Sequence, residues 1–162
     1  MSATDPKLNS IQVPTLSFHQ PALVDTNALL KSAIQKLPPE VRSDVVLRCD
    51  ELAHLQCPED HIEKAFTQLL QMIVAEKAMD AKLYLYIKCS AENKKEKETI
   101  PNELQRFSIQ FHTNITAHAA WMQAAEQRIN GIASLLLPFG GSFLVNQLKN
   151  SGCIFCISLP GK

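Results

Sequence analysis

The sequence has no excess of charge of either sign. Its sixteen basic and sixteen acidic side chains cancel to a formal net charge of zero, so no overall field attracts the chain to nucleic acid or to anionic lipid. It also lacks an apolar run near the roughly 20 residues that a membrane span needs, and residues 1–10 lack the basic and apolar parts of a signal peptide. We therefore expect a cytoplasmic protein without a nucleic-acid partner and without a membrane segment in this chain.

A disulfide framework is not indicated either. The five cysteines are odd in number and scattered through apolar segments, which suits buried free thiols in a reducing compartment. Cys153 and Cys156 have the spacing of a metal or redox motif, but on a strand their side chains would point to opposite faces. No second pair stands at zinc-finger spacing, so we expect no metal site.

The chain does have enough apolar sequence for one sizeable core. With 162 residues and 46% apolar content it fits the usual size of a single domain. Residues 1–20 are polar and interrupted by prolines, so we expect a flexible tail or linker there, with at most a short strand at Thr15–Phe18. Residues 21–162 would form the folded domain.

Three segments have the apolar periodicity of helices. The expected helices run from Asp25 or Thr26 to about Leu37, from Pro58 to about Met79, and over about 116–137. The second has the strongest pattern in the chain. Gly131 and Pro138 are the points where the third helical segment would bend or split into two.

Short β-branched or alternating runs predict the strands. They are expected at 44–49, 82–89, 107–111, 142–148 and 153–159. Gly140 and Gly141 would reverse the chain before the fourth strand, and Pro160 would end the fifth. This order predicts an α+β fold: a two-layer sandwich in which a mixed, mostly antiparallel, five-stranded sheet carries about three helices on one face.

Three phrases stand in order along this pattern. They are VDTNALLKSAI at 24–34, DHIEKAFTQLLQMIVAE at 60–76, and IASLLLPFGGSFLVNQLKNSGCIFCISLP at 132–160. They resemble the opening helix, the N-box helix and the glycine-containing ending of the ATP-binding domain of sensor histidine kinases. That domain belongs to the gyrase and histidine-kinase superfamily and has the Bergerat fold, so the resemblance implies this fold.

The resemblance also places the ATP site, and the residues there differ from the family pattern. The N-box asparagine that coordinates magnesium matches Met72, whose thioether is a poor ligand for a hard cation. The asparagine one turn earlier matches Gln68, which keeps a carbonyl oxygen. The resemblance therefore implies that the ordinary magnesium ligand is missing.

Two further family elements are altered. The aspartate that binds the adenine amino group matches Thr113, with Asn114 as the acceptor if the register slips by one, and Ile115 and Ala117 replace glycines. The glycine-rich segment that cradles the phosphates matches Gln123–Ile129, which has no glycine and carries Glu126. The candidate site residues are thus Gln68, Met72, Thr113 and Asn114, with no catalytic residue assigned and no cofactor expected.

We expect a non-catalytic, degenerate histidine-kinase-like domain, or pseudokinase, which acts in two-component signal transduction by docking a partner protein. It would dock through the exposed edge of the sheet or through the altered lid surface. Homodimerisation would need dimerisation helices outside these residues. The alternative is a divergent histidine kinase that binds ATP and magnesium through Gln68, Asn114 and Lys64 and phosphorylates a histidine. A third hypothesis is a small-molecule sensor whose vacated pocket is lined by Met72 and Ile115.

Overall fold

The computed structural model describes residues 22–76, 81–92, 105–116, 119–148 and 152–162. The expected tail at 1–20, its strand at Thr15–Phe18 and the expected helix end at Met79 lie outside these residues. Along the chain the elements are β2 (Leu23–Asp25), α2 (Thr26–Gln35), α3 (Pro39–Arg42), β3 (Val45–Cys49), β4 (His54–Gln56), α4 (Glu59–Ala75), β5 (Leu83–Ala91), β6 (Gln105–Thr113), α5 (Ala119–Ala124), α6 (Glu126–Leu136), the 3₁₀ turn η2 (Leu137–Phe139), β7 (Ser142–Gln147) and β8 (Cys153–Gly161).

The strands form one mixed sheet. Its centre is an antiparallel series in which β5 pairs with β6, β6 with β8 and β8 with β7, while β3 runs parallel to β5 at the edge. These five strands are the ones that the sequence predicts. The short strands β2 and β4 pair with each other and join the end of β8 through Leu55 and Gly161, which makes the sheet seven-stranded.

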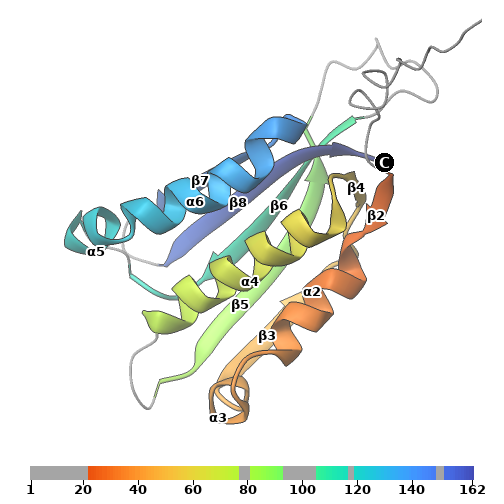
Figure 1. The fold of residues 1–162 in the computed structure, drawn as a ribbon. Helices are drawn as coiled ribbons and strands as arrows, with labels where there is room; N and C mark the ends of the chain where they lie inside the picture. The colour runs from red at the N-terminus through yellow and green to blue at the C-terminus, as the bar shows by residue number, and fades with distance from the viewer. Residues whose placement is uncertain (1–21, 77–80, 93–104, 117–118, 149–151) are drawn as a thin grey trace, which may run out of the picture.

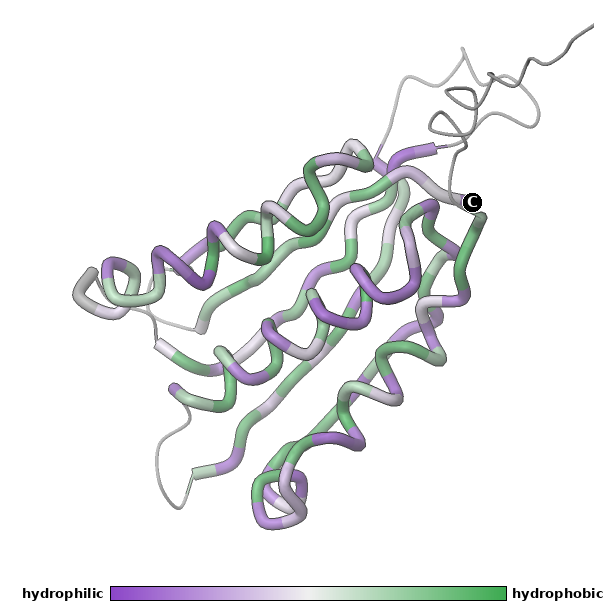
Figure 2. The backbone as a smooth tube through the Cα atoms, in the orientation of Figure 1, coloured by the Kyte–Doolittle hydropathy of each residue, from purple (hydrophilic) through white to green (hydrophobic). Residues whose placement is uncertain are grey.

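The helices cover one face of this sheet, so the fold is the predicted α+β two-layer sandwich. Figure 1 shows α2, α4 and α6 side by side over the strands, with α4 in the middle. In Figure 2 hydrophobic and hydrophilic residues alternate along the strands, as expected when only one face of a sheet is covered. None of the described helices combines the length and the apolarity that crossing a membrane requires.

The central helix α4 forms where the apolar periodicity is strongest. Pro58 immediately precedes it, and Glu59 and Asp60 occupy the first turn, where their charges favour the positive end of the helix dipole. Its buried side chains follow the expected i, i+3, i+4 pattern, and the ring of Phe66 lies 5.9 Å from the ring of Phe111 on β6. The helix is held to the sheet by this apolar face.

The start of α2 uses both residues that the sequence offers as caps. The Asp25 carboxylate accepts a hydrogen bond from the backbone N–H of Asn27 at 3.0 Å, which is the capping bond. The Thr26 side chain is buried, and its hydroxyl donates to the carbonyl of Ala53 at 2.6 Å. Asp25 is therefore the cap, and Thr26 ties the helix to the loop that precedes β4.

Two expected breaks lie elsewhere. The third helical segment divides at Ala125, between α5 and α6, and Gly131 lies inside α6 without interrupting it. Strand β8 continues through Pro160 to Gly161, so the prediction that Pro160 ends the strand is wrong. On this side of β8, β7 pairs only as far as Ser158 and β4 pairs only at Gly161. Pro160 lies between them, so the backbone N–H that proline lacks is not needed for a bond to a described strand there.

The chain reversal before β7 depends on the expected glycine pair. Gly140 has a φ of 79°, in the left-handed region, and its N–H donates to the carbonyl of Leu137. Gly141 is constrained by space instead, since a Cβ there would lie 2.8 Å from the Cβ of Leu136 and 2.9 Å from the carbonyl oxygen of Ser158. These contacts fix the close approach of α6 to β8.

Two alanine substitutions should therefore have opposite effects. Gly141→Ala should lower the free energy of unfolding by about 1–3 kcal/mol, because its Cβ meets backbone and a neighbouring Cβ. Gly131→Ala adds a Cβ with no atom within 4 Å in a helix interior and should raise it by about 0.5–1 kcal/mol. Urea unfolding of both variants measures the difference, and equal effects would contradict this account of the turn.

Candidate functional site

The two N-box positions on α4 face different surroundings. Met72 is 1% exposed and belongs to the hydrophobic core beneath the helix. Gln68 is exposed on the outer side of the same helix. The residue that matches the magnesium ligand thus points into packed apolar side chains, and only the earlier position reaches solvent.

A cleft does lie between α4 and α6. It has a volume of about 370 Å³ and is lined by Gln68, Gln71 and Ala75 of α4 and by Arg128 of α6. Arg128 falls within the segment that matches the phosphate-binding loop, yet the sequence analysis did not single it out. Arg128 lies in the first turn of α6, and its place beside α4 could not be found from the sequence because the start of this helix was not predicted.

A second groove, of about 460 Å³, lies on the opposite flank of α4, toward α2. Gln68 and Lys64 line it together with Lys36, Asp60, Glu63, Thr67 and Gln71, and Lys36 forms an ion pair of 2.6 Å with Glu63. Asn114 is not among these residues. The structure therefore brings Gln68 and Lys64 together but does not bring Asn114 to them.

Thr113 and Asn114 hold the end of β6 to its neighbours. The Thr113 hydroxyl donates to the carbonyl of Cys153 on β8 at 2.9 Å. The Asn114 carbonyl oxygen accepts from the N–H of Tyr84 at 2.9 Å, and its amide nitrogen donates to the carbonyl of Lys82 at 3.1 Å. Both side chains already have partners within the sheet, at the positions that match the adenine-binding element.

The family's ATP lid matches the segment around Trp121 and Met122, and this segment packs on the core. Trp121 on α5 is 8% exposed and lies edge-on to Phe155 of β8, with the ring centroids 6.2 Å apart. Ile115 and Ala125 are buried at either end of α5. Trp121 is therefore a core residue, and Met72 and Ile115 are core residues rather than the lining of a described cleft.

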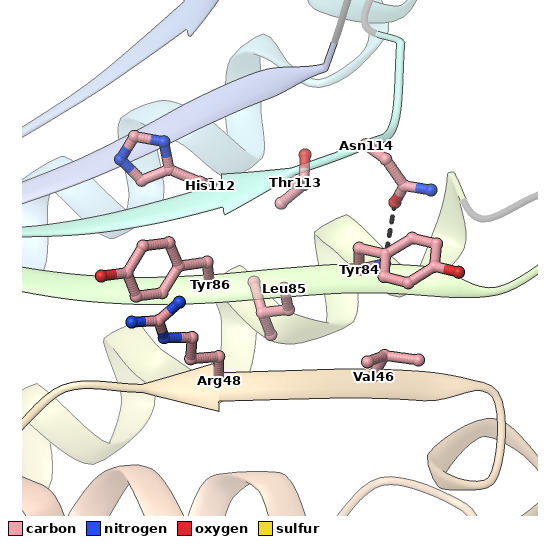
Figure 3. A pocket seen from close by; sticks show the side chains of 8 residues that line it. All are labelled: Val46, Arg48, Tyr84, Leu85, Tyr86, His112, Thr113 and Asn114. Carbon is pink, nitrogen blue, oxygen red and sulfur yellow. Dashed lines mark hydrogen bonds between the residues drawn. The ribbon is translucent and has the colours of Figure 1, made fainter.

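The uncovered face of the sheet carries a third cleft, of about 320 Å³. Figure 3 shows the side chains that line it, which come from β3, β5 and the end of β6: Val46, Arg48, Tyr84, Leu85, Tyr86, His112, Thr113 and Asn114. The Arg48 guanidinium lies 4.7 Å from the centre of the Tyr86 ring. Burial, and then the Lys88 cation, lower the pKa of His112 and so favour the neutral ring. Of these eight residues only Thr113 and Asn114 were candidate site residues from the sequence, and the other six were missed.

The cysteines are free thiols. Cys153 is buried on the helix-covered face, whereas the Cys156 sulfur contacts the Ser108 hydroxyl at 2.9 Å, so the two point to opposite faces as expected. Burial raises the pKa of Cys57 to about 12 and that of Cys153 to about 11, which keeps both thiols protonated at neutral pH. No group of three or more potential metal-ligating side chains occurs among the described residues.

Solved structures of histidine kinases share this fold. The mycobacterial sensor histidine kinase MprB matches with a TM-score of 0.64 and 11% identity, over 87% of this chain and 99% of that one. Acinetobacter baumannii histidine kinase AdeS matches with a TM-score of 0.64 and 12% identity, over 93% of this chain and 72% of that one. The catalytic domain of histidine kinase ThkA matches with a TM-score of 0.59 and 11% identity, over 89% and 97%.

No family model matches the chain, and no curated protein matches it in sequence. The likeness to the kinases is therefore one of structure, at identities too low to carry function. The chain has the fold of a histidine kinase ATP-binding domain, the Bergerat fold, as the three phrases predict.

The burial of Met72 can be tested by restoring the family's residue. Met72→Asn should lower the free energy of unfolding by about 1–3 kcal/mol, because an amide without a partner would lie among apolar side chains. Gln68→Asn, on the exposed side of α4, controls for asparagine in the helix and should change it by less than about 0.5 kcal/mol. Chemical denaturation measures both, and equal stabilities would show that Met72 is not a core residue.

Proposed function

We propose that this chain is a non-catalytic histidine-kinase-like domain that acts in signal transduction by docking a partner protein, and that it does not bind ATP with magnesium in the manner of active kinases. The cytoplasm, where thiols stay reduced, suits its free cysteines. The partner would dock on the exposed edge of the sheet or on the surface of α5 and α6.

The observation that carries this proposal is the burial of Met72. Magnesium bound to nucleotide needs hard oxygen ligands on a surface that the phosphates can reach. Met72 offers sulfur, and it points into the core. At the adenine position, the groups of Thr113 and Asn114 that would bind a base are engaged by β8 and β5.

The packing of α5 favours a fixed docking surface over a lid that opens and closes. Trp121 and Ala125 pack against the core, and the exposed side chains of α5 and of the start of α6 make up the patch on which a partner would dock. The exposed side chains of this patch include Gln123, Gln127 and Arg128. A preformed surface of this kind limits the ordering cost of binding a partner.

One observation favours the alternative, a divergent kinase domain. Arg128 and Gln68 line the same cleft between α4 and α6, where a cation and an amide could hold phosphate oxygens. Against it, Glu126 stands in the first turn of α6 and would repel the same phosphates. Nucleotide titration separates the two functions.

Calorimetric titration of the protein with ATP and magnesium should give no binding up to millimolar nucleotide. If micromolar binding appears and both Gln68→Ala and Arg128→Ala abolish it, the docking proposal is wrong and the cleft is a nucleotide site. Gln35→Ala, at the exposed end of α2 and outside this cleft, is the matched control.

The proposal that a partner protein docks on this domain needs a separate measurement in cells. A photo-crosslinking residue at Gln123, on the exposed side of α5, should form a discrete adduct with a different protein. The same residue at Lys31, on the exposed side of α2, should not form that adduct. Equal labelling at the two positions would remove the support for docking through the lid surface.

A further inference from the structure

The edge strand β3 has a row of backbone groups without partners among the described residues. The N–H of Leu83 donates to the carbonyl of Asp44 at 2.8 Å, and the N–H of Asp50 donates to the carbonyl of Ile87 at 2.9 Å. In a parallel ladder alternate residues bond to the neighbouring strand, so Asp44, Val46, Arg48 and Asp50 face β5. The N–H and C=O groups of the residues between them point outward, and no described residue is bonded to them.

Apolar side chains are exposed at the same edge. Val46 is 45% exposed and Leu47 is 42% exposed, on opposite faces of β3, and Tyr84 beside Val46 is 55% exposed. The other exposed large apolar side chains of the described residues are spread over β2, η2 and the β7 region. Natural edge strands are often protected by charged side chains, above all lysine, or by proline or a bulge. β3 has no lysine, proline or bulge, and its one charged side chain, Arg48, lies over the Tyr86 ring.

We propose that a second copy of this chain covers this edge, with the two β3 strands antiparallel about a twofold axis at Val46, so that the two sheets become one. This inference uses neither the nucleotide cleft nor the lid surface, and a dimer at this edge would leave the surface of α5 and α6 for the docking of a partner. It also differs from dimerisation through helices outside these residues. A twofold pairing is self-complementary, so a single exposed edge is sufficient to form it.

The hydrogen-bonding groups restrict the possible registers. The outward groups belong to Val45, Leu47 and Cys49, and antiparallel strands bond through residues that lie directly opposite each other. A twofold axis at Val46 sets Val45 of each copy opposite Leu47 of the other, with both residues facing outward. Each such pair can exchange both backbone bonds. A slip of one residue in pairing would set outward groups against groups already bonded to β5.

The charges select among the registers that remain. An axis at Leu47 sets Asp44 opposite Asp50 of the other copy, and an axis at Arg48 sets that residue opposite itself. Like charges directly opposite each other destabilise a pair of strands. An axis at Val46 instead sets Arg48 of each copy opposite Asp44 of the other, so that opposite charges meet on both sides of the axis. This register is the charge-complementary one.

The same register gathers the exposed apolar side chains. Val46 of each copy would lie opposite its equivalent on the uncovered face, flanked by Tyr84 from each β5. Leu47 would pack beside Val45 of the other copy on the helix-covered face. Arg48 is already held over the Tyr86 ring at 4.7 Å, so ordering its side chain against Asp44 costs less than for a free arginine.

Sedimentation velocity of the full chain over a concentration series should reveal a species of twice the monomer mass. Arg48→Asp would place like charges opposite each other on both sides of the axis and should weaken dimerisation by about tenfold or more. The double variant Asp44→Arg with Arg48→Asp exchanges the charges and should restore it. Leu144→Lys, on the exposed side of edge strand β7, is the matched control and should leave the dimer intact.

Hydrogen exchange gives a second measurement that needs no variant. The amides of Val45, Leu47 and Cys49 should exchange more slowly as the protein concentration rises, because only the dimer bonds them. A monomer at millimolar concentration would overturn the proposal. So would a dimer that Arg48→Asp leaves unchanged while these amides show no concentration dependence, since that dimer would use another surface. If the double variant unfolds, the exchange data alone decide.

Discussion

The apolar face of α4 against the middle of the sheet is the contact on which the rest of the fold depends. Fully burying a large apolar side chain contributes about 1.5–3 kcal/mol, and α4 buries seven residues along its length. Helices α2 and α6 pack on either flank of α4. The positions of both flanking helices are thus set by where α4 lies.

This contact also explains why the N-box positions behave differently. A residue on a helix that covers a sheet either faces the strands or faces away, and Met72 is on the inner face with Leu69 and Ile73. A polar ligand residue there would need either an adjoining cavity or a bound partner. Methionine fills the space with flexible apolar atoms, and the helix then packs on the sheet over its full length.

The sequence predicted the elements whose stability is local. The periodicity of α4 and the alternation along β5 and β6 reflect burial on one face, so helices, strands and their order could be inferred from the pattern. The strands β2 and β4 were missed because three residues carry no period. They form where Leu55 meets Gly161 at the far end of the chain. The break at Ala125 was misplaced because Gly131 has open space around it and tolerates the helix.

The sequence predicted which positions form the candidate site, but not where their side chains point. The resemblance located Gln68, Met72, Thr113 and Asn114, but the partners of their side chains come from strands distant in sequence. Arg48 and Tyr86 were missed for the same reason, since their contact exists only once β3 and β5 are aligned. The exposure of β3 could not be predicted either, because it depends on what fails to pack against that strand.

The end of β6 is fastened on both sides by consecutive residues, Thr113 to β8 and Asn114 to β5. Sheet ends normally fray first, because their last pairs have neighbours on one side only. Here the side chains add a rung beyond the backbone ladder, and Ile115 follows directly into the core. A hinge needs a few residues free to change their backbone angles, and these three are not. The chain therefore leaves the sheet toward α5 from a point that is bonded to both neighbouring strands.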